Sequence, residues 1–421
     1  MFGNRSLRFD ILIILSIVSE MLALFFLYNQ GITGSIFNAF LLFLSSVSTG
    51  LLLIGKFYNR DISLQYGNNK KLNSFLLFIC LAISLWMIYS FSNILKNTPI
   101  DIRWSDIIPA IEIVVKRFID GQNPYSPMTE LGYTTPVGYM PFHWLPFTIA
   151  EKLHIDYRWI SFSIWLITSI FFIIRLKRHN SIGATILFIV SALLNFFILN
   201  YNIGIVAMTV ELLIASYYML FVASINSNYF LTLGATTALC LLSRYSFAMW
   251  LPLFIFILYV SGNRATFYKA ALVALAIIIL CYVIPFLSKD WSLPFQTLNN
   301  YAGMNWEWQH LCDNGLPCNL FKGLGFAQLF YKYFGAANFK AAFTVCRNVF
   351  FIATISTTVL SGIWYWINKQ KIDAKIFSLA SLKIYFSVFS AFMIVPYDYL
   401  MITGLMISVA IYAEQAHFTV K

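Results

Sequence analysis

The sequence predicts an all-α membrane protein of about twelve transmembrane helices, with two interfacial helices in its first outer loop. Of its 421 residues, 60% are hydrophobic and 11% are charged, whereas soluble globular domains average about 45–50% apolar and 25% charged residues. The mean hydropathy of +0.75 points the same way. At about 20 residues per span, residues 1–421 form one transmembrane domain with two long loops. This composition excludes a soluble enzyme.

Twelve apolar runs, separated by polar residues, glycine or proline, account for the predicted helices. They are residues 9–28, 35–55, 73–95, 157–176, 182–199, 203–225, 229–243, 246–262, 270–288, 346–367, 375–395 and 397–413. With the N-terminus in the cytoplasm, every strongly basic connection falls on the inner side, as the positive-inside rule requires. The excess of 28 Lys and Arg over 17 Asp and Glu therefore indicates topology, not a nucleic-acid partner.

The stretch 229–262 decides the second half of this topology. It could form one long helix, but Ser243, Arg244 and Tyr245 interrupt its apolar sequence. Two short spans keep Arg264 inside and send the next long loop outside. We therefore expect two spans.

Two connections are long enough to hold a functional site, residues 96–156 and 289–345. The predicted topology places both on the outer face, so function is expected there. In the second loop, Cys312 and Cys318 bracket a turn-rich sequence. In an oxidising compartment this spacing predicts a disulfide, and two free thiols are the alternative.

The first outer loop contains a predicted amphipathic helix that Ser105 can cap. Its charged side chains share one face and its apolar side chains cover the other. The apolar face consists of Ile107, Ile108, Ile111, Val114, Val115, Phe118 and Ile119. Such a helix lies in the plane of the outer headgroups and holds Asp106 at the depth of a lipid-linked phosphate. The alternative is that Asp106 only caps the helix or interacts with its dipole.

A second surface helix is predicted between Tyr139 and Phe147. Pro141 and Pro146 interrupt the regular pattern, and the aromatic residues of this stretch suit a membrane interface. This helix leads into the fourth apolar run.

The first outer loop also resembles that of a known family. Asp106 begins a helix about fifteen residues before the Gly-x-x-Pro-Tyr sequence of residues 121–125, and a Tyr/Pro-rich helix follows. This arrangement is similar to the GT-C superfamily of polyprenyl-phosphate-sugar-dependent glycosyltransferases, above all its bacterial mannosyltransferase-like branch. The resemblance covers residues 101–160 and otherwise extends only to topology. It implies that Asp106 is the general base, with Asp101 as the fallback in the same loop.

The implied reaction needs a carboxylate to take the proton of the acceptor hydroxyl, and cations or donors to stabilise the leaving phosphate. Arg244 lies at the outer end of the pair 229–262, where family members often place a Lys or Arg. A guanidinium can bind phosphate through two hydrogen bonds, and an arginine that reaches to headgroups is the alternative. Weaker candidates for the phosphate are Arg103, Lys116, Arg117 and Arg347.

Five further residues are candidates for binding substrate. They are Tyr125, His143, Tyr245, His310 and Asp398. The two histidines are outer residues in aromatic sequence, and a structural role is the alternative for each. Glu307 and His310 have the i,i+3 spacing of a helical metal site, but no further ligand cluster is apparent. We expect neither a metal nor another cofactor.

Glu20, Glu211 and Lys383 lie within apolar runs, where an unpaired charge costs at least ~2.5 kcal/mol and indicates function by default. An ion pair between Glu211 and Lys383 is the structural alternative. A transporter or flippase for a lipid-linked substrate would depend on these charges, although no internal repeat supports it. An oligosaccharide ligase or polymerase with a diphosphate-linked donor would depend on the second outer loop and His310.

The leading expectation is a multi-pass enzyme of the bacterial plasma membrane with its active site on the periplasmic side. It would transfer mannose or another hexose from a polyprenyl monophosphate to a lipid-linked or glycan acceptor. Its partners would be these two substrates and the lipid bilayer, with no nucleic acid.

Overall fold

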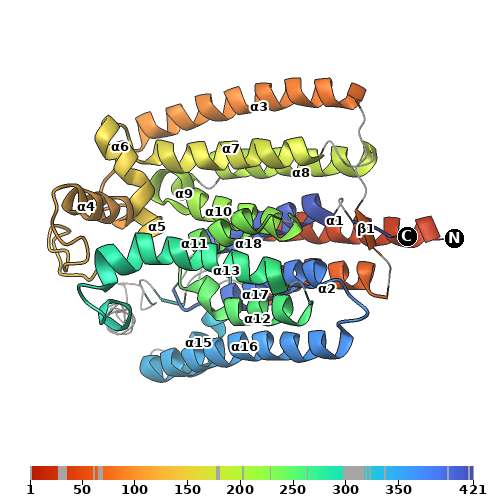
Figure 1. Ribbon diagram of the computed structural model, residues 1–421. Coiled ribbons are helices and arrows are strands. Elements are labelled where there is room, and N and C mark those ends of the chain that lie inside the picture. Colours follow the sequence, from red (N-terminus) through yellow and green to blue (C-terminus); the bar gives the residue numbers. More distant parts are fainter. Residues whose placement is uncertain are drawn as a thin grey trace.

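In a computed structural model, the chain forms a bundle of α-helices that run roughly side by side (Figure 1). The structure describes residues 2–26, 36–59, 62–64, 70–176, 181–201, 203–227, 229–262, 264–296, 317, 320–321, 324–335, 338–395, 398–415 and 418–420. The helices of the first half are α1 Phe2–Phe26, α2 Ile36–Phe57, α3 Lys70–Asn97, α4 Ile107–Ile119, α5 Pro141–Trp144, η2 Leu145–Phe147, α6 Thr148–Leu153, α7 Arg158–Leu176 and α8 Ser181–Asn200. Those of the second half are α9 Ile203–Met208, α10 Glu211–Asn226, α11 Phe230–Leu241, α12 Ser246–Val260, α13 Arg264–Ile278, the π-helix η3 Ile279–Leu287, α15 Ala327–Phe334, α16 Phe339–Asn368, α17 Ala374–Ala391 and α18 Asp398–Gln415.

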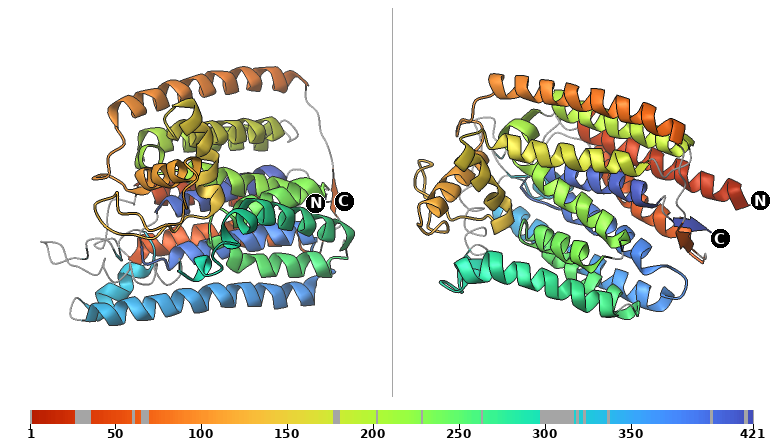
Figure 2. Two further views of the ribbon diagram at one scale, coloured as in Figure 1. Left: turned by 60° about the vertical axis from the view of Figure 1, so that its left-hand side comes forward. Right: turned by 45° about the horizontal axis from the view of Figure 1, so that its top comes forward.

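The two ends of the bundle differ. Helices α4, α5 and α6 gather at one end, which we call the loop end, and both chain termini lie at the other, the terminal end (Figures 1 and 2). At the terminal end, β1 (Ile62–Leu64) pairs antiparallel with β2 (Phe418–Val420).

Basic residues from separate connections meet acceptors at the terminal end. Lys56 donates to Asp10 over 2.6 Å, and Arg175 pairs with Glu414. Lys375 forms a further contact there, a hydrogen bond to a backbone carbonyl at the end of α10. Segments that the positive-inside rule groups on one side of a membrane therefore come together at one end of the bundle.

Among the described residues, seven helices are long and apolar enough to cross a membrane, by length and composition. They are Leu7–Phe26, Ile36–Phe57, Phe78–Asn97, Arg158–Arg175, Arg264–Leu287, Phe339–Asn368 and Ala374–Ala391. Within the described ranges, shorter apolar helices are Phe188–Asn200, Glu211–Asn226, Phe230–Leu241, Ser246–Val260 and Tyr399–Gln415. The prediction of a helical membrane protein is therefore confirmed, whereas the number of about twelve spans stays a prediction.

The predicted break within 229–262 is confirmed. Helix α11 ends at Leu241 and α12 begins at Ser246. The turn between them lies at the loop end, because the carbonyl of Leu242 accepts a hydrogen bond from the N–H of Phe142 over 2.9 Å. The two helices therefore form a hairpin that returns to the terminal end.

The predicted run 203–225 is not one helix. Helix α9 ends at Met208 and α10 begins at Glu211. Between them, the hydroxyl of Thr209 donates to the carbonyl of Ile205 and accepts from the N–H of Glu211. A threonine that bonds nearby backbone in this way competes with helix continuation, and Glu211 becomes the first residue of a new helix.

The second long loop is shorter than predicted. Helix α16 begins at Phe339, earlier than the expected 346, and α15 occupies part of the predicted 289–345 loop. The early start is explained by packing, because the buried Phe343 and Cys346 join Phe321 in a small separate core.

Close backbone contact brings α2 against α17 in the middle of the bundle. A Cβ at Gly50 would lie 2.7 Å from Cγ1 of Ile384 and 2.8 Å from the carbonyl oxygen of Ala380. Small residues allow such approaches between helices in membranes. As a result, polar side chains on α1, α2, α17 and α18 reach one another.

Candidate functional site

The carboxylate of Asp106 is not used as a helix cap. Asp106 is the N-cap residue of α4, but its side chain makes no capping hydrogen bond. Its Oδ2 instead accepts from the hydroxyl of Tyr133 over 2.5 Å. Ser105, which we predicted as the cap, directly precedes the N-cap residue. Its Oγ accepts from the N–H of Ile107 over 3.3 Å and donates to the carbonyl of Met208 over 3.0 Å. The half-exposed carboxylate is therefore left to interact with other groups.

Helix α4 has the predicted position and the predicted apolar face. Ile108, Ile111, Val114 and Val115 are buried, and the helix packs on α5, η2 and α6. The predicted second surface helix corresponds to α5 and η2. Because protein covers the apolar face of α4, its placement in a membrane interface stays a prediction.

Asp101 is held by Arg103 through three side-chain hydrogen bonds of 2.5–3.0 Å. Hydrogen bonds from the side chain and backbone of Arg103 lower the pKa of Asp101 to about 2. A carboxylate with so low a pKa is a weak proton acceptor at neutral pH. The side chain of Arg103 is itself 82% exposed. This pair is therefore poorly suited to the roles of base and phosphate ligand that the sequence suggested.

The predicted ion pair between Glu211 and Lys383 is wrong. Glu211 pairs with Arg244, with 2.5 Å between Oε2 and Nη2, and its Oε1 accepts from Thr403 of α18 over 2.9 Å. The Arg244 guanidinium also lies over the ring of Tyr399, 5.1 Å from its centroid. Glu211 is thus located beside the turn at the loop end, not in the middle of the bundle.

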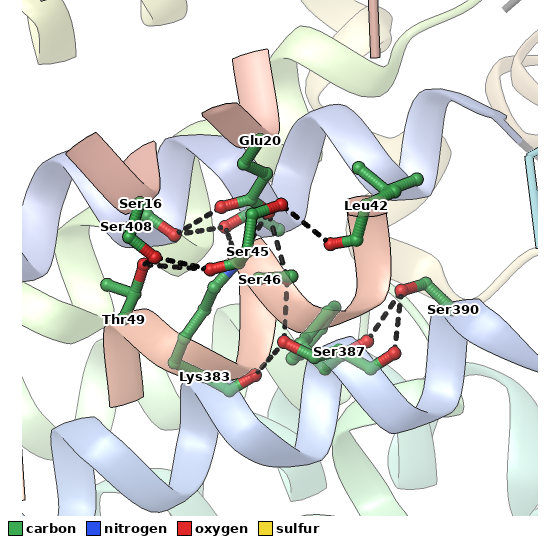
Figure 3. Close-up of polar contacts among 12 residues, drawn as sticks. Ser16, Glu20, Leu42, Ser45, Ser46, Thr49, Lys383, Ser387, Ser390 and Ser408 are labelled. Atoms are coloured by element: carbon green, nitrogen blue, oxygen red, sulfur yellow. Dashed lines mark hydrogen bonds and ion pairs between the residues drawn. The ribbon is translucent and has the colours of Figure 1, made fainter. Parts of the chain in front are cut away.

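Lys383 pairs with Glu20 instead (Figure 3). Its Nζ donates to Oε1 of Glu20 over 2.6 Å and to the carbonyl of Gly404 over 2.9 Å. Ser46 and Ser408 donate to the two oxygens of the same carboxylate, over 2.9 and 3.0 Å. The pair is thus well hydrogen-bonded within four helices. The sequence could not reveal it, because helical periodicity does not say which helices are neighbours.

His143 in α5 lies against the same turn and is 4% exposed. Its ring hydrogen-bonds the backbone of Ser243 and stacks on Tyr139, with centroids 4.6 Å apart. Burial, followed by the positive charge of Arg244, lowers the pKa of His143 to about 3. The ring is therefore neutral at physiological pH, and its Nε2 has no hydrogen-bond partner.

Tyr125, from the Gly-x-x-Pro-Tyr sequence, packs beside these groups. Its ring lies 6.4 Å from that of Trp144 and 5.3 Å from that of Phe286. Burial raises the pKa of Tyr125, so its hydroxyl stays protonated. Tyr245 is partly buried near this hydroxyl.

Unpartnered buried polar atoms concentrate in this region. Six buried side-chain atoms lack a hydrogen-bond partner within the described ranges, and four of them lie at the loop end: Tyr125 Oη, His143 Nε2, Trp144 Nε1 and Arg244 Nε. Native proteins satisfy most buried polar groups, so such a cluster calls for an explanation such as a ligand or water.

The remaining predicted residues are not part of this cluster. Arg347 lies on α16 with its guanidinium 5.7 Å from the ring centroid of Phe343. Asp398 begins α18 next to Tyr399. The predicted residues Glu307, His310, Cys312 and Cys318 lie outside the described residues.

Sequence reasoning missed the partners of the predicted residues. Tyr133 was visible in a Tyr/Pro-rich stretch, but its bond to Asp106 depends on how the loop folds back. Trp144 was visible as an aromatic residue, but not as an unpartnered donor. Among the described residues, no group of three His, Cys, Asp or Glu side chains is placed to hold a metal ion.

Comparison of the chain with models of known protein families, with curated proteins and with solved structures found no match.

Proposed function

We propose that this chain is a polytopic membrane glycosyltransferase of the GT-C type. It transfers mannose or another hexose from a polyprenyl monophosphate to a lipid-linked or glycan acceptor, at the periplasmic face of a bacterial plasma membrane. One observation carries this proposal. The carboxylate of Asp106, which does not cap its helix, lies at the same end of the bundle as the buried donors around Arg244.

The reaction assigns Asp106 as the base. The acceptor oxygen forms a bond to the anomeric carbon of the donor sugar while the bond from that carbon to the phosphate oxygen breaks. The acceptor's proton passes to the carboxylate, and polyprenyl phosphate leaves with the bonding electrons. The hydrogen bond from Tyr133 fixes one carboxylate oxygen, which leaves the other to approach the acceptor hydroxyl.

The leaving phosphate is assigned to the donors around Arg244. Tyr125, Trp144 and Arg244 each contribute a buried O–H or N–H, the type of group that stabilises developing negative charge. Glu211 neutralises much of the charge of Arg244 and holds its guanidinium in place. At this position, hydrogen bonds to the leaving phosphate would therefore stabilise it more than net charge does.

The segment 208–211 connects the two parts of the proposed site. Met208 accepts the hydrogen bond from Ser105, which directly precedes the base, and Glu211 pairs with Arg244. In this proposal the chain spans the membrane about twelve times, and the loop end faces the periplasm because basic residues gather at the terminal end.

A transporter or flippase is the second candidate, and one observation favours it. A cavity of about 330 Å³, including space open to solvent, is lined in part by Glu20, the partner of Lys383. A charge pair within membrane helices that a cavity reaches is typical of substrate and proton pathways. A third candidate, a ligase using diphosphate-linked donors, rests on His310 alone.

The test uses purified protein in liposomes with a lipid extract of the bacterial envelope as acceptor. We would supply labelled hexoses on a polyprenyl monophosphate or on a polyprenyl diphosphate. The proposal predicts label in a new product from the monophosphate only. Transfer from the diphosphate alone would indicate the ligase, and movement of the intact labelled donor across the bilayer without product would indicate the flippase.

A further inference from the structure

A cleft at the loop end lies next to the proposed base and has no part in the reaction so far. It is bounded by the end of α3, the start of α4 and α9, and has a volume of about 440 Å³, including space open to solvent.

The walls of the cleft are tied together by hydrogen bonds. Arg158, whose side chain is 3% exposed, donates to the carbonyl of Thr98 over 2.6 Å and to that of Ala207 over 3.2 Å. Ser105 adds its bond to the carbonyl of Met208. The cleft is therefore built into the fold, and a ligand would not have to create it.

The lining combines an aromatic surface with a few polar groups. Trp104 is 70% exposed, and Pro109 adds apolar surface. The polar groups are the amide of Asn97, the hydroxyl of Ser105 and the carboxylate of Asp101. Arg103 holds that carboxylate in its ionised form, so it only accepts hydrogen bonds.

A sugar ring matches these features on both of its sides. Its C–H face is apolar and packs on the face of an indole, while its hydroxyls both donate and accept hydrogen bonds. A small number of polar groups in an otherwise apolar cleft then fixes the orientation of the ring.

The cleft opens beside Asp106. Ser105 lines the cleft, and Asp106 is the next residue along the chain. A ring held in the cleft would therefore lie close to the start of α4, where the proposed base is located.

We propose that this cleft is the acceptor subsite and binds a hexose ring through Trp104. The proposal rests on the proposed function, which supplies the need for an acceptor.

An exposed tryptophan at the end of a membrane helix can also be an interface anchor. Trp291 provides a matched control, because it is 66% exposed and follows η3. An anchoring role would make Trp104→Ala and Trp291→Ala equivalent, whereas a sugar subsite would separate them.

The experiment measures saturation-transfer NMR signals of methyl α-mannopyranoside, methyl β-glucopyranoside and methyl β-galactopyranoside with the purified full chain. We expect at least one hexoside to give a signal that falls at least threefold in Trp104→Ala and is unchanged in Trp291→Ala. Trp104→Phe should retain an intermediate signal, and a thermal scan of each variant checks folding. No hexoside signal in the wild type, or equal signals in both alanine variants, would overturn the subsite.

The liposome transfer assay separates this inference from the proposed function. If transfer occurs and Trp104→Ala has the wild-type KM for the acceptor extract, the subsite is wrong and the proposed function stands. If hexosides bind through Trp104 but no donor supports transfer, the cleft is a sugar site and the proposed function is wrong.

Discussion

Replacing Arg244 distinguishes a phosphate ligand from a residue that only pairs with Glu211. Arg244→Ala would leave Glu211, whose side chain is 1% exposed, without its partner, a change that costs about 3–5 kcal/mol. Unfolding would then obscure any effect on the donor. Arg244→Lys keeps the positive charge beside Glu211 but removes the unpartnered Nε donor. It is therefore the informative variant.

The expected effect of Arg244→Lys is on donor binding. Loss of one hydrogen bond to a charged group costs about 1.5–3 kcal/mol, which corresponds to a roughly 10- to 150-fold weaker interaction with the donor. The assay is a titration of transfer rate against polyprenyl-phosphate hexose, with thermal unfolding in detergent as the check on folding. Arg158→Lys is the control, because Arg158 binds backbone carbonyls at the same end and should change stability without changing the donor titration. An unchanged donor titration in a folded Arg244→Lys protein would refute the assignment.

Three further predictions concern the buried pair, the histidine and the sidedness of the chain. Lys383→Met should destabilise the protein by about 3–5 kcal/mol because Glu20 keeps a buried, unpaired charge. In thermal unfolding, the double variant Glu20→Gln/Lys383→Met should recover most of the lost stability. A double variant as unstable as Lys383→Met would contradict this prediction. His143 has a folded-state pKa of about 3, so below pH 6.5 the unfolded chain binds the extra proton and stability should fall by about 1.4 kcal/mol per pH unit. Unfolding of His143→Gln between pH 5 and 7 should lack this contribution, and an identical pH dependence in both proteins would exclude it. In a cysteine-free background, an impermeant maleimide should label Gln122→Cys on intact cells and Gln370→Cys only after permeabilisation, and the reverse pattern would invert the topology.

Local sequence features predicted the helices well. Apolar runs with basic connections predicted the bundle, and the polar interruption at Ser243–Tyr245 predicted the hairpin of α11 and α12. The spacing of apolar residues in 105–119 predicted the buried face of α4. Each of these features depends on contacts between residues close in sequence, or on one residue's solvation.

The same reasoning could not predict which charged side chains on distant helices form ion pairs. Glu20 and Lys383 are 363 positions apart and meet because α2 packs closely on α17 next to α1 and α18. Glu211 differs from them because Thr209 ends the preceding helix and puts the carboxylate at a helix start. Neither the position of Glu20 nor that of Glu211 can be inferred from neighbouring sequence, because each appears simply as a carboxylate within an apolar run.

The candidate site was predicted in part. Asp106, Tyr125, His143 and Arg244 were identified from residue type and position, and the structure brings the last three close together at the loop end. The hydrogen bonds between Asp101 and Arg103 could not be predicted, because an Asp-x-Arg sequence alone does not fix side-chain geometry.

Transfer by Asp106→Asn tests the central claim most directly. The substitution removes the proton acceptor with little change in shape, and a general base contributes about 10²–10⁴-fold to a rate. In liposomes with polyprenyl-phosphate hexose, we predict that Asp106→Asn loses at least about 100-fold of the wild-type transfer rate while its donor binding and thermal stability are kept. Asp101→Asn, as the control, should keep most of its activity. Wild-type transfer by Asp106→Asn, or loss in Asp101→Asn alone, would contradict the account.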